Sequence, residues 1–220
     1  MASIKHVRLY LITDDTRSAG RPVDAVVERA VRGERRLRGE RRLRGGAQCV
    51  QYRPFGISDG EFFDTAVKLR AITRDAGALL IINDRCDIAL AAGADGVHLG
   101  VGDIPIVEAK KLLGRGGVVG FSAHSGREAV RAQEEGADYI TLGPLFPTTS
   151  ASGREAMGLK KWKRAAAGVK IPVFALGGIN RGNIGEAVAA GVGRVAVVSA
   201  ITRARDVAAA ARGFCEKLKV

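Results

Sequence analysis

Short apolar runs and helical segments alternate along nearly the whole chain, and this alternation limits the fold more than any other feature. The runs recur about every 20 to 25 residues, and several are continuous, as expected for strands buried on both faces. The eight predicted strands span residues 7–12, 48–53, 78–82, 96–99, 117–121, 138–142, 171–176 and 194–198. In a chain of 220 residues this pattern predicts one (β/α)8 TIM barrel as a single domain over residues 1–220.

Helices are predicted in the intervals, over residues 23–31, from Ser58 onward, and over 85–92, 104–113, 127–135, 160–167, 184–190 and 206–218. An open doubly wound sheet is the alternative architecture. Gly177 and Gly178 after the seventh strand and Ser199 after the eighth favour the barrel. In barrels, the loops at these two places frequently bind phosphate through backbone N–H groups.

The net charge of +12 is partly local. Residues 32–44 hold seven Arg and two Glu, and the sequence Gly-Glu-Arg-Arg-Leu-Arg of residues 33–38 is repeated over 39–44. We interpret this duplicated insertion as a solvated charged segment. Contact with nucleic acid is not expected, because no aromatic side chains for base stacking interleave the arginines.

Several classes of protein are not favoured by the composition. No apolar run approaches the roughly 20 residues of a membrane helix, and we see no signal peptide. Cys49, Cys86 and Cys215 are scattered in apolar surroundings, which favours buried free thiols and a reducing compartment, the cytoplasm.

Carboxylates follow two successive predicted strands. Asn83 and Asp84 end the strand at 78–82, and Asp103 lies in the Gly-rich turn after the strand at 96–99. The carboxyl ends of parallel barrel strands open on one face, so Asp84 and Asp103 can meet there. Two facing carboxylates repel each other unless a cation lies between them, and hard oxygen ligands suit Mg²⁺. We therefore predict a magnesium site at Asp84 and Asp103.

Other polar residues are expected at the same face: Gln51, Arg53, Asn83, Ser122, His124, Thr148, Thr149, Ser150 and Ser199, with Gly178 beside them. No Cys or Lys nucleophile is expected among them, which argues against Schiff-base chemistry. A dinucleotide is also not expected, because no Gly-x-Gly-x-x-Gly opens a helix. A cation site, an arginine and a glycine-rich cradle indicate small phosphorylated substrates, two of them or one with a diphosphate leaving group.

Each assignment has a structural alternative. Asn83 and Asp84 could cap the helix that follows them, Asp103 could cap a helix beginning at Ile104, and Ser122 and Thr148 could serve only as turn hydroxyls. His98 lies within a predicted strand and is expected to be a hydrogen-bonded interior residue. His124 is left open between a loop role and a site role.

The chain resembles the thiamine-phosphate synthase family in a series of segments that follow one another in order. They are Leu-Tyr-Leu-Ile-Thr-Asp at 9–14, Val-Gln-Tyr-Arg at 50–53, Ile-Asn-Asp-Arg at 82–85, Asp-Gly-Val-His-Leu-Gly at 95–100, Ser-Ala-His-Ser at 122–125, Gly-Pro-Leu-Phe-Pro-Thr at 143–148, Ala-Leu-Gly-Gly-Ile at 175–179 and Val-Ser-Ala-Ile at 198–201. Each segment is weak alone, and together they are specific over residues 7 to 218.

The resemblance implies a Mg²⁺-dependent transferase that joins hydroxymethylpyrimidine diphosphate to thiazole phosphate and releases diphosphate. Gln51 and Arg53 would hold the pyrimidine diphosphate, with further contacts from Asn83 and Ser122. The resemblance implies that Asp84 and Asp103 bind Mg²⁺. Thr148 and Ser150 would contact the thiazole phosphate, joined by the backbone at Gly178, Val198 and Ser199, and Thr149 is also expected to bind substrate. Arg53, Asn83 and Ser122 are the expected catalytic residues, in a dissociative reaction that needs charge neutralisation more than a general base.

This sequence departs from the family pattern at the diphosphate, as a divergent member. Where the family has Gln-x-Arg-Glu-Lys, this chain has Pro54 and Phe55 in the last two places, and Ala151 stands where a lysine usually follows the Thr-x-Thr/Ser. Val101 replaces a frequent Gln. We expect the loss of two cations to weaken diphosphate binding.

Two other functions stay open at this point. One is an isomerase resembling the thiazole tautomerase, which would use His124 for proton transfer and would need no Mg²⁺. The other is a catalytically weak paralogue that binds thiamine-pathway phosphates, RNA or a protein. A homodimer is kept as an open expectation.

Overall fold

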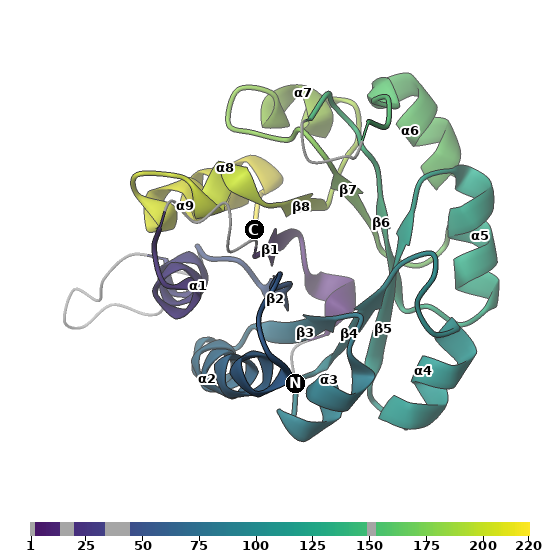
Figure 1. Cartoon of the computed structure of the whole chain (residues 1–220). Helices are drawn as coiled ribbons and strands as arrows, with labels where there is room; N and C mark the ends of the chain where they lie inside the picture. Colours follow the sequence, from purple (N-terminus) through teal and green to yellow (C-terminus); the bar gives the residue numbers. More distant parts are fainter. Residues whose placement is uncertain (1–2, 14–19, 34–44, 149–152) are drawn as a thin grey trace.

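Eight parallel strands close into one barrel in the computed structural model, which describes residues 3–13, 20–33, 45–148 and 153–220. Each strand pairs with the next in sequence, and β8 pairs with β1 to close the sheet. The predicted (β/α)8 TIM barrel is therefore confirmed, with the helices outside the sheet (Figure 1). The strands are β1 (Leu9–Ile12), β2 (Cys49–Tyr52), β3 (Leu79–Asn83), β4 (Gly96–Leu99), β5 (Val118–Ala123), β6 (Tyr139–Leu142), β7 (Val173–Leu176) and β8 (Val195–Val197).

Helices follow the strands around the outside of the barrel. They are α1 (Val23–Arg32), α2 (Asp59–Ala76), α3 (Cys86–Ala91), α4 (Ile106–Leu113), α5 (Gly126–Glu134), α6 (Gly158–Ala166), α7 (Ile184–Ala189), α8 (Ser199–Thr202) and α9 (Val207–Leu218), and the 3-10 turn η1 (Ile4–His6) precedes β1. Ser58 caps α2 as predicted, in a capping box with Glu61. Most other boundaries differ from the prediction by one or two residues, and the short helix α8 was not predicted. For example, β5 continues through Ala123, and α4 begins at Ile106 after Pro105.

Two separate apolar cores stabilise the barrel. The larger core lies between sheet and helices and includes Leu9, Leu11 and Val50 from the outer face of the strands. The smaller core fills the interior of the barrel with Tyr10, Ile81, Tyr139 and Phe174 among others. Alternate residues of one strand enter different cores because successive side chains in a strand point to opposite faces.

Glycine at one interior position makes room for an aromatic ring. Gly120 on β5 pairs with Tyr139 on β6, and a Cβ atom at Gly120 would lie 2.1 Å from Cζ of Tyr139. Tyr139 in turn packs edge-on against Tyr10 and Phe174, with ring centroids 5.6 Å apart in both pairs. The interior is thus filled by aromatic rings from β1, β6 and β7, and a side chain at position 120 does not fit.

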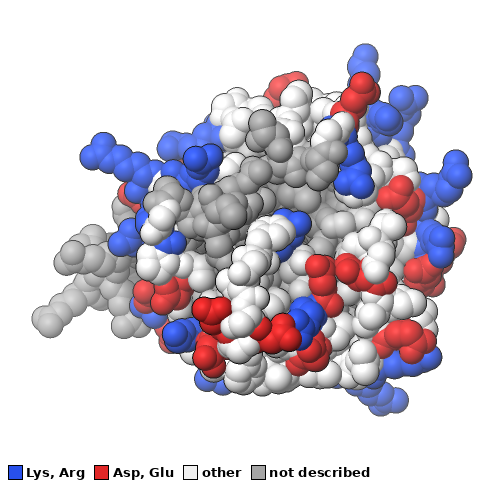
Figure 2. All heavy atoms as spheres, viewed as in Figure 1, with Lys and Arg blue, Asp and Glu red and all other residues white. Residues whose placement is uncertain are grey.

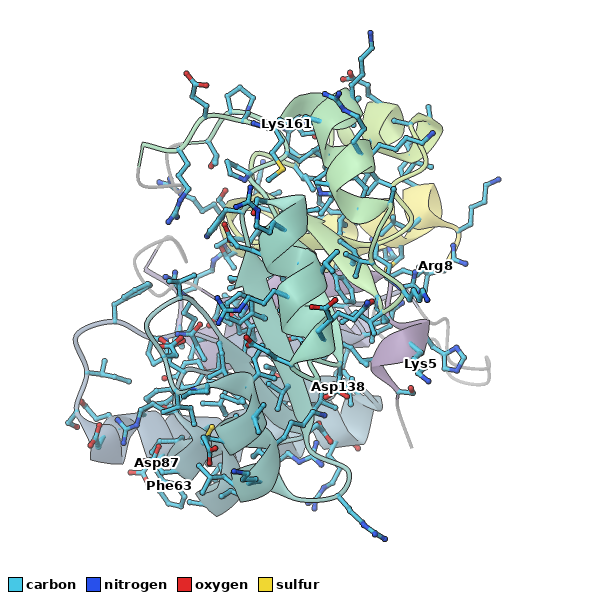
Figure 3. The ribbon with its side chains drawn as sticks, turned by 90° about the vertical axis from the view of Figure 1, so that its right-hand side faces the viewer. Lys5, Arg8, Phe63, Asp87, Asp138 and Lys161 are labelled. Atoms are coloured by element: carbon cyan, nitrogen blue, oxygen red, sulfur yellow. The ribbon has the colours of Figure 1, made fainter. Side chains whose placement is uncertain are left out.

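The amino-terminal end of the barrel is closed by hydrogen bonds to aspartates and by η1. Asp95 and Asp138 each accept a backbone N–H from the strand beside them, that of Leu80 and that of Val119. Ile4 and Val7 pack into the interior core from this end. Figure 3 shows Lys5 and Arg8 at this end, and Asp87 and Phe63 toward the other. The carboxyl-terminal end is therefore the one available for a site.

The described helices include none with the length and apolarity needed to cross a membrane. Cys49, Cys86 and Cys215 are free and buried, as predicted. The duplicated Arg-rich segment lies, except for Gly33, outside the described residues.

Candidate active site

The structure brings predicted site residues from several strands to the carboxyl-terminal end of the barrel, the face shown in Figures 1 and 2. Gln51 lies in β2, Asn83 ends β3, and Ser122 lies near the end of β5. Acidic side chains gather on the side of this face that carries α2 and α3 (Figure 2). Asp59 begins α2, Asp87 lies in α3, and Asp84 comes shortly before α3.

Asp84 and Asp103 lie close together, as the sequence predicted. The two carboxyl groups share a hydrogen bond, and burial together with the charge of Asp103 raises the pKa of Asp84 to about 6. Asp103 is fixed by its Oδ2, which accepts the N–H of Gly100 at 2.6 Å. The alternative in which Asp103 caps a helix at Ile104 is wrong, because α4 begins at Ile106 and its cap residue is Pro105.

Asp84 has an unusual backbone conformation. Its φ of 61° is in the left-handed region, which non-glycine residues seldom adopt. Its Oδ2 accepts a hydrogen bond from Nδ2 of Asn83 at 2.6 Å. The chain therefore accepts backbone strain and repulsion between carboxylates at one point of the mouth, a combination that is typical of functional sites.

The oxygen atoms of this pair fit a magnesium ion. Within the described residues, no three His, Cys, Asp or Glu side chains cluster as a complete metal site. Mg²⁺ does not require such a cluster, because it is commonly held by one or two carboxylates together with water and substrate phosphates. A cation between Asp84 and Asp103 would also remove the repulsion that raises the pKa of Asp84.

Arg53 provides positive charge next to the carboxylates. Its charge acts to lower the pKa of Asp84 and that of His98, which places the guanidinium within electrostatic range of both. Its Cζ lies 4.4 Å from the ring centroid of Phe55, and its backbone N–H donates to Oγ1 of Thr13 at 3.0 Å. Phe55, where the family resemblance leads us to expect a lysine, thus stacks on the guanidinium of Arg53.

A hydrogen-bond chain crosses the barrel interior between two predicted site residues. Nε2 of Gln51 donates to the hydroxyl of Tyr10 at 2.9 Å, and that hydroxyl lies 2.7 Å from the hydroxyl of Tyr139. The Tyr139 hydroxyl lies 3.0 Å from Nδ1 of His98, whose Nε2 lies 2.8 Å from Oγ of Ser122. We call these five residues the interior chain.

The interior chain holds His98 in its neutral form. Burial, and secondly the charge of Arg53, lowers the pKa of His98 to about 3. The prediction of a hydrogen-bonded interior histidine is confirmed. Sequence reasoning missed the roles of Tyr10 and Tyr139. The signal in the sequence was the same for both: a tyrosine, whose hydroxyl needs a hydrogen-bond partner when buried, at a strand position that faces the barrel interior.

Glycines shape the opposite wall of the mouth. Gly178 has a φ of 67°, and a Cβ atom there would lie 2.5 Å from the carbonyl oxygen of Pro147. The loop after β6 is attached to this turn because Phe146 donates its N–H to the carbonyl of Gly177 at 3.0 Å. Thr148 follows in the same loop and is partly buried. The predicted glycine-rich turn is thus present, and the close approach of backbone explains why these positions are glycine.

Val198 and Ser199 lie at the end of β8, where α8 begins at Ser199.

His124 is hydrogen-bonded to neighbouring segments: its Nδ1 donates to the carbonyl of Gly143 at 3.0 Å, and its backbone N–H donates to the carboxylate of Glu128 at 2.8 Å. His124 therefore has a clear structural role. Thr149, Ser150 and Ala151 lie outside the described residues.

Known proteins are similar to this chain over nearly its full length. The model of the family described as thiamine monophosphate synthase matches residues 9–201. A thiamine-phosphate synthase of Chloroflexus aurantiacus is 43% identical over 96% of this chain and 93% of that protein, and one of Chlorobium luteolum is 46% identical over 94% and 90%. The solved thiamine phosphate pyrophosphorylase of Pyrococcus furiosus superimposes with a TM-score of 0.84 at 35% identity, over 98% and 96% of the two chains.

Proposed function

We propose that this chain, which belongs to the thiamine monophosphate synthase family, joins 4-amino-2-methyl-5-hydroxymethylpyrimidine diphosphate to thiazole phosphate and releases diphosphate. The observation that carries the proposal is the pair of facing carboxylates, Asp84 and Asp103, at the mouth of a barrel that matches the family from end to end. The protein is then a transferase of thiamine biosynthesis, and we propose that it acts in the cytoplasm.

Mg²⁺ is the proposed cofactor, bound by Asp84 and Asp103. When bound, it would supply positive charge to the departing diphosphate oxygens. We propose Arg53 and Asn83 as the residues that hold the same diphosphate. Arg53 is suited to this role because its guanidinium can bind phosphate oxygens with two N–H groups at once. Concentrating positive charge at the leaving group favours cleavage of its C–O bond.

The remaining predicted residues have binding roles in this proposal. Gln51 and Ser122 would contact the pyrimidine, which would lie above the barrel interior in this proposal. Thr148, Thr149, Ser150 and Ser199, with the backbone at Gly178 and Val198, would bind the thiazole phosphate. A pyrimidine methylene cation, formed as the diphosphate leaves, would then meet the thiazole nitrogen in a site that needs positioning more than a proton acceptor.

The experiment is a reconstitution with the purified protein, both substrates and Mg²⁺, with thiamine phosphate detected by its fluorescence after oxidation. We expect product that disappears when either substrate is omitted or a chelator is added. Absence of product, with the thiazole phosphate still raising the melting temperature, would overturn the transferase proposal. An assay of thiazole tautomerisation would then separate an isomerase from a binding protein.

A further inference from the structure

The interior chain couples the two residues at its ends, Gln51 and Ser122. Each member between them has a single proton to donate along the chain: one on each phenol and one on the neutral ring of His98. A phenol that accepts a hydrogen bond from one neighbour must therefore donate to the other. The direction of the first hydrogen bond fixes the direction of all the following ones.

The first hydrogen bond begins at Gln51, whose Nε2 can only donate. The Tyr10 hydroxyl accepts this bond and donates to the hydroxyl of Tyr139, which in turn donates to Nδ1 of His98. Nδ1 is then the unprotonated nitrogen. The proton of the imidazole is on Nε2 and is donated to Oγ of Ser122.

This order has a consequence at each end. Because the amide nitrogen of Gln51 is turned inward, its carbonyl oxygen is the group left to accept a hydrogen bond from a ligand. Because Ser122 accepts from His98, its own proton is free to be donated to a ligand or to Oγ1 of Thr141, 3.2 Å away. The reverse order would require Gln51 to turn its oxygen inward and a hydroxyl to donate to Nε2 of His98, either that of Ser122 at 2.8 Å or that of Thr141 at 3.3 Å.

We propose that Tyr10, Tyr139 and His98 are positioning residues that select a 4-aminopyrimidine over a 4-oxopyrimidine by fixing an acceptor at Gln51 and a donor at Ser122. An aminopyrimidine carries an amino group that donates and a neighbouring ring nitrogen that accepts. A 4-oxopyrimidine presents the opposite pattern, a carbonyl that accepts and a ring N–H that donates. The proposal rests on the proposed function for its choice of ring.

Burial explains why the order can persist. Tyr10 and Tyr139 are fully buried and His98 is 3% exposed, so water does not replace a missing partner inside the chain. If the direction of only one hydrogen bond in the chain were reversed, two donors or two acceptors would face each other. The direction can therefore change only if every hydrogen bond of the chain reverses together. A buried donor or acceptor without a partner is costly, which ties the two ends to one another.

The first measurement is the ¹⁵N NMR spectrum of the His98 ring in the protein without substrate. We expect a protonated Nε2 and an unprotonated Nδ1. A spectrum with the proton on Nδ1 would overturn the proposal, whatever the catalytic activity of the protein.

The second measurement is calorimetric binding of 4-amino-2-methyl-5-hydroxymethylpyrimidine diphosphate and of its 4-oxo analogue to wild type and Tyr139→Phe. This variant removes one hydroxyl and keeps the ring. We expect the Kd for the amino compound to rise roughly tenfold, as for the loss of one ordered hydrogen bond, and the preference over the oxo compound to shrink by a similar factor. The Kd for thiazole phosphate should not change.

Tyr52→Phe is the matched control, because Tyr52 lies next to Gln51 on β2 but faces outward and packs edge-on against Phe62. It should bind both rings as wild type does. If Tyr139→Phe does not fold, Tyr10→Phe breaks the same chain one step earlier. Equal binding of the two rings to wild type, or an unchanged preference in Tyr139→Phe, would contradict the proposal. Because no turnover is needed, failure of the synthase activity alone would not be mistaken for failure of this inference.

Discussion

The interior chain and the carboxylate pair lie next to each other in the barrel and have opposite characters. Inside, Tyr10, Tyr139 and His98 satisfy one another with hydrogen bonds of 2.7 to 3.0 Å. At the mouth, Asp84 and Asp103 repel each other, and Asp84 has a left-handed backbone. The hydrogen bonds of the interior are completed within the protein, whereas at the mouth the two carboxylates repel each other despite the nearby charge of Arg53.

The difference indicates where ligand binding can be gained. A group whose partners are already present loses hydrogen bonds when a ligand approaches, but a repelling pair of carboxylates is relieved by a cation. Strain and repulsion at the mouth are tolerated because the two apolar cores stabilise the barrel independently of it. The interior should therefore control stability and orientation, and the mouth should control charge-dependent binding.

The largest expected effect is on the mouth. In Asp84→Asn, the side chain keeps its shape, and asparagine tolerates the left-handed backbone better than most residues. We expect the rate of thiamine phosphate formation to fall roughly hundredfold, because a ligand of the proposed Mg²⁺ is lost. Steady-state kinetics measure it. The control is Asp87→Asn, an exposed aspartate paired with Arg85, which should retain nearly full activity.

The unfolding free energy of Asp84→Asn also tests whether the mouth of the barrel, unlike its interior, contributes little to stability. Since the change removes repulsion, stability should be unchanged or higher than in wild type. A large loss of stability would show that Asp84 serves the fold rather than the site.

The interior is tested by Gly120→Ala. The added methyl group would meet the ring of Tyr139, with Cζ at 2.1 Å, and both residues are packed in the barrel. We expect a loss of about 2 to 3 kcal/mol in the unfolding free energy, measured with urea. Gly185→Ala in α7 is the matched control: a Cβ there has open space, and alanine favours a helix, so it should stabilise slightly. Equal changes in unfolding free energy for the two variants would show that a clash with Tyr139 is not the cause.

The pH dependence of Mg²⁺ binding sharpens the contrast. The pKa of Asp84 is raised to about 6, so the stability linked to its protonated form is fully present below the ordinary pKa of an aspartate and is lost as the pH rises through 6. Mg²⁺ should restore it, since the ion binds the ionised pair. We expect a larger Mg²⁺-induced increase in melting temperature at pH 7.5 than at pH 5, measured by calorimetry. An equal increase in melting temperature at both pH values would show that Mg²⁺ does not bind at Asp84.

The smallest expected effect comes from Phe55→Lys, which restores a cation at the position of the family lysine. The new charge should lower the KM for pyrimidine diphosphate by a few fold, with the gain limited by loss of the contact between Phe55 and Arg53. Steady-state kinetics at two salt concentrations measure it. Phe55→Leu, which adds no charge, is the control. A KM that rises in both variants would mean that the stacked ring positions Arg53.

The barrel and the pairing of Asp84 with Asp103 could be predicted from sequence because each depends on local features: apolar runs of strand length, and carboxylates just after two of them. Boundaries were less accurate. Ser122 lies within β5 rather than at its tip, because ladder pairing with Thr141 extends the strand by sheet contacts that a local pattern does not contain.

The interior chain could not be predicted because it depends on contacts between residues far apart in sequence. In the sequence, Tyr10 and Tyr139 are indistinguishable from the apolar residues of their short strands. Only closure of the barrel brings their two hydroxyl oxygens to 2.7 Å from each other. The cause of Gly120 is equally nonlocal, since it reflects a ring from the neighbouring strand. Side-chain contacts across the barrel interior, unlike residues placed at strand ends, can be recognised only once the fold is known.

The placement of η1 has a practical consequence for protein engineering. Ile4 and Val7 fill the amino-terminal end of the interior, so η1 is part of the packed barrel. A bulky affinity tag or fusion partner attached just before it would pull against this packing. The end of α9 lies at this same end of the barrel, since Nη1 of Arg8 donates to the carbonyl of Leu218 at 2.9 Å. A partner attached after α9 would therefore also lie on the side of the barrel away from the candidate site, so immobilising the protein there leaves the mouth of the barrel facing solution.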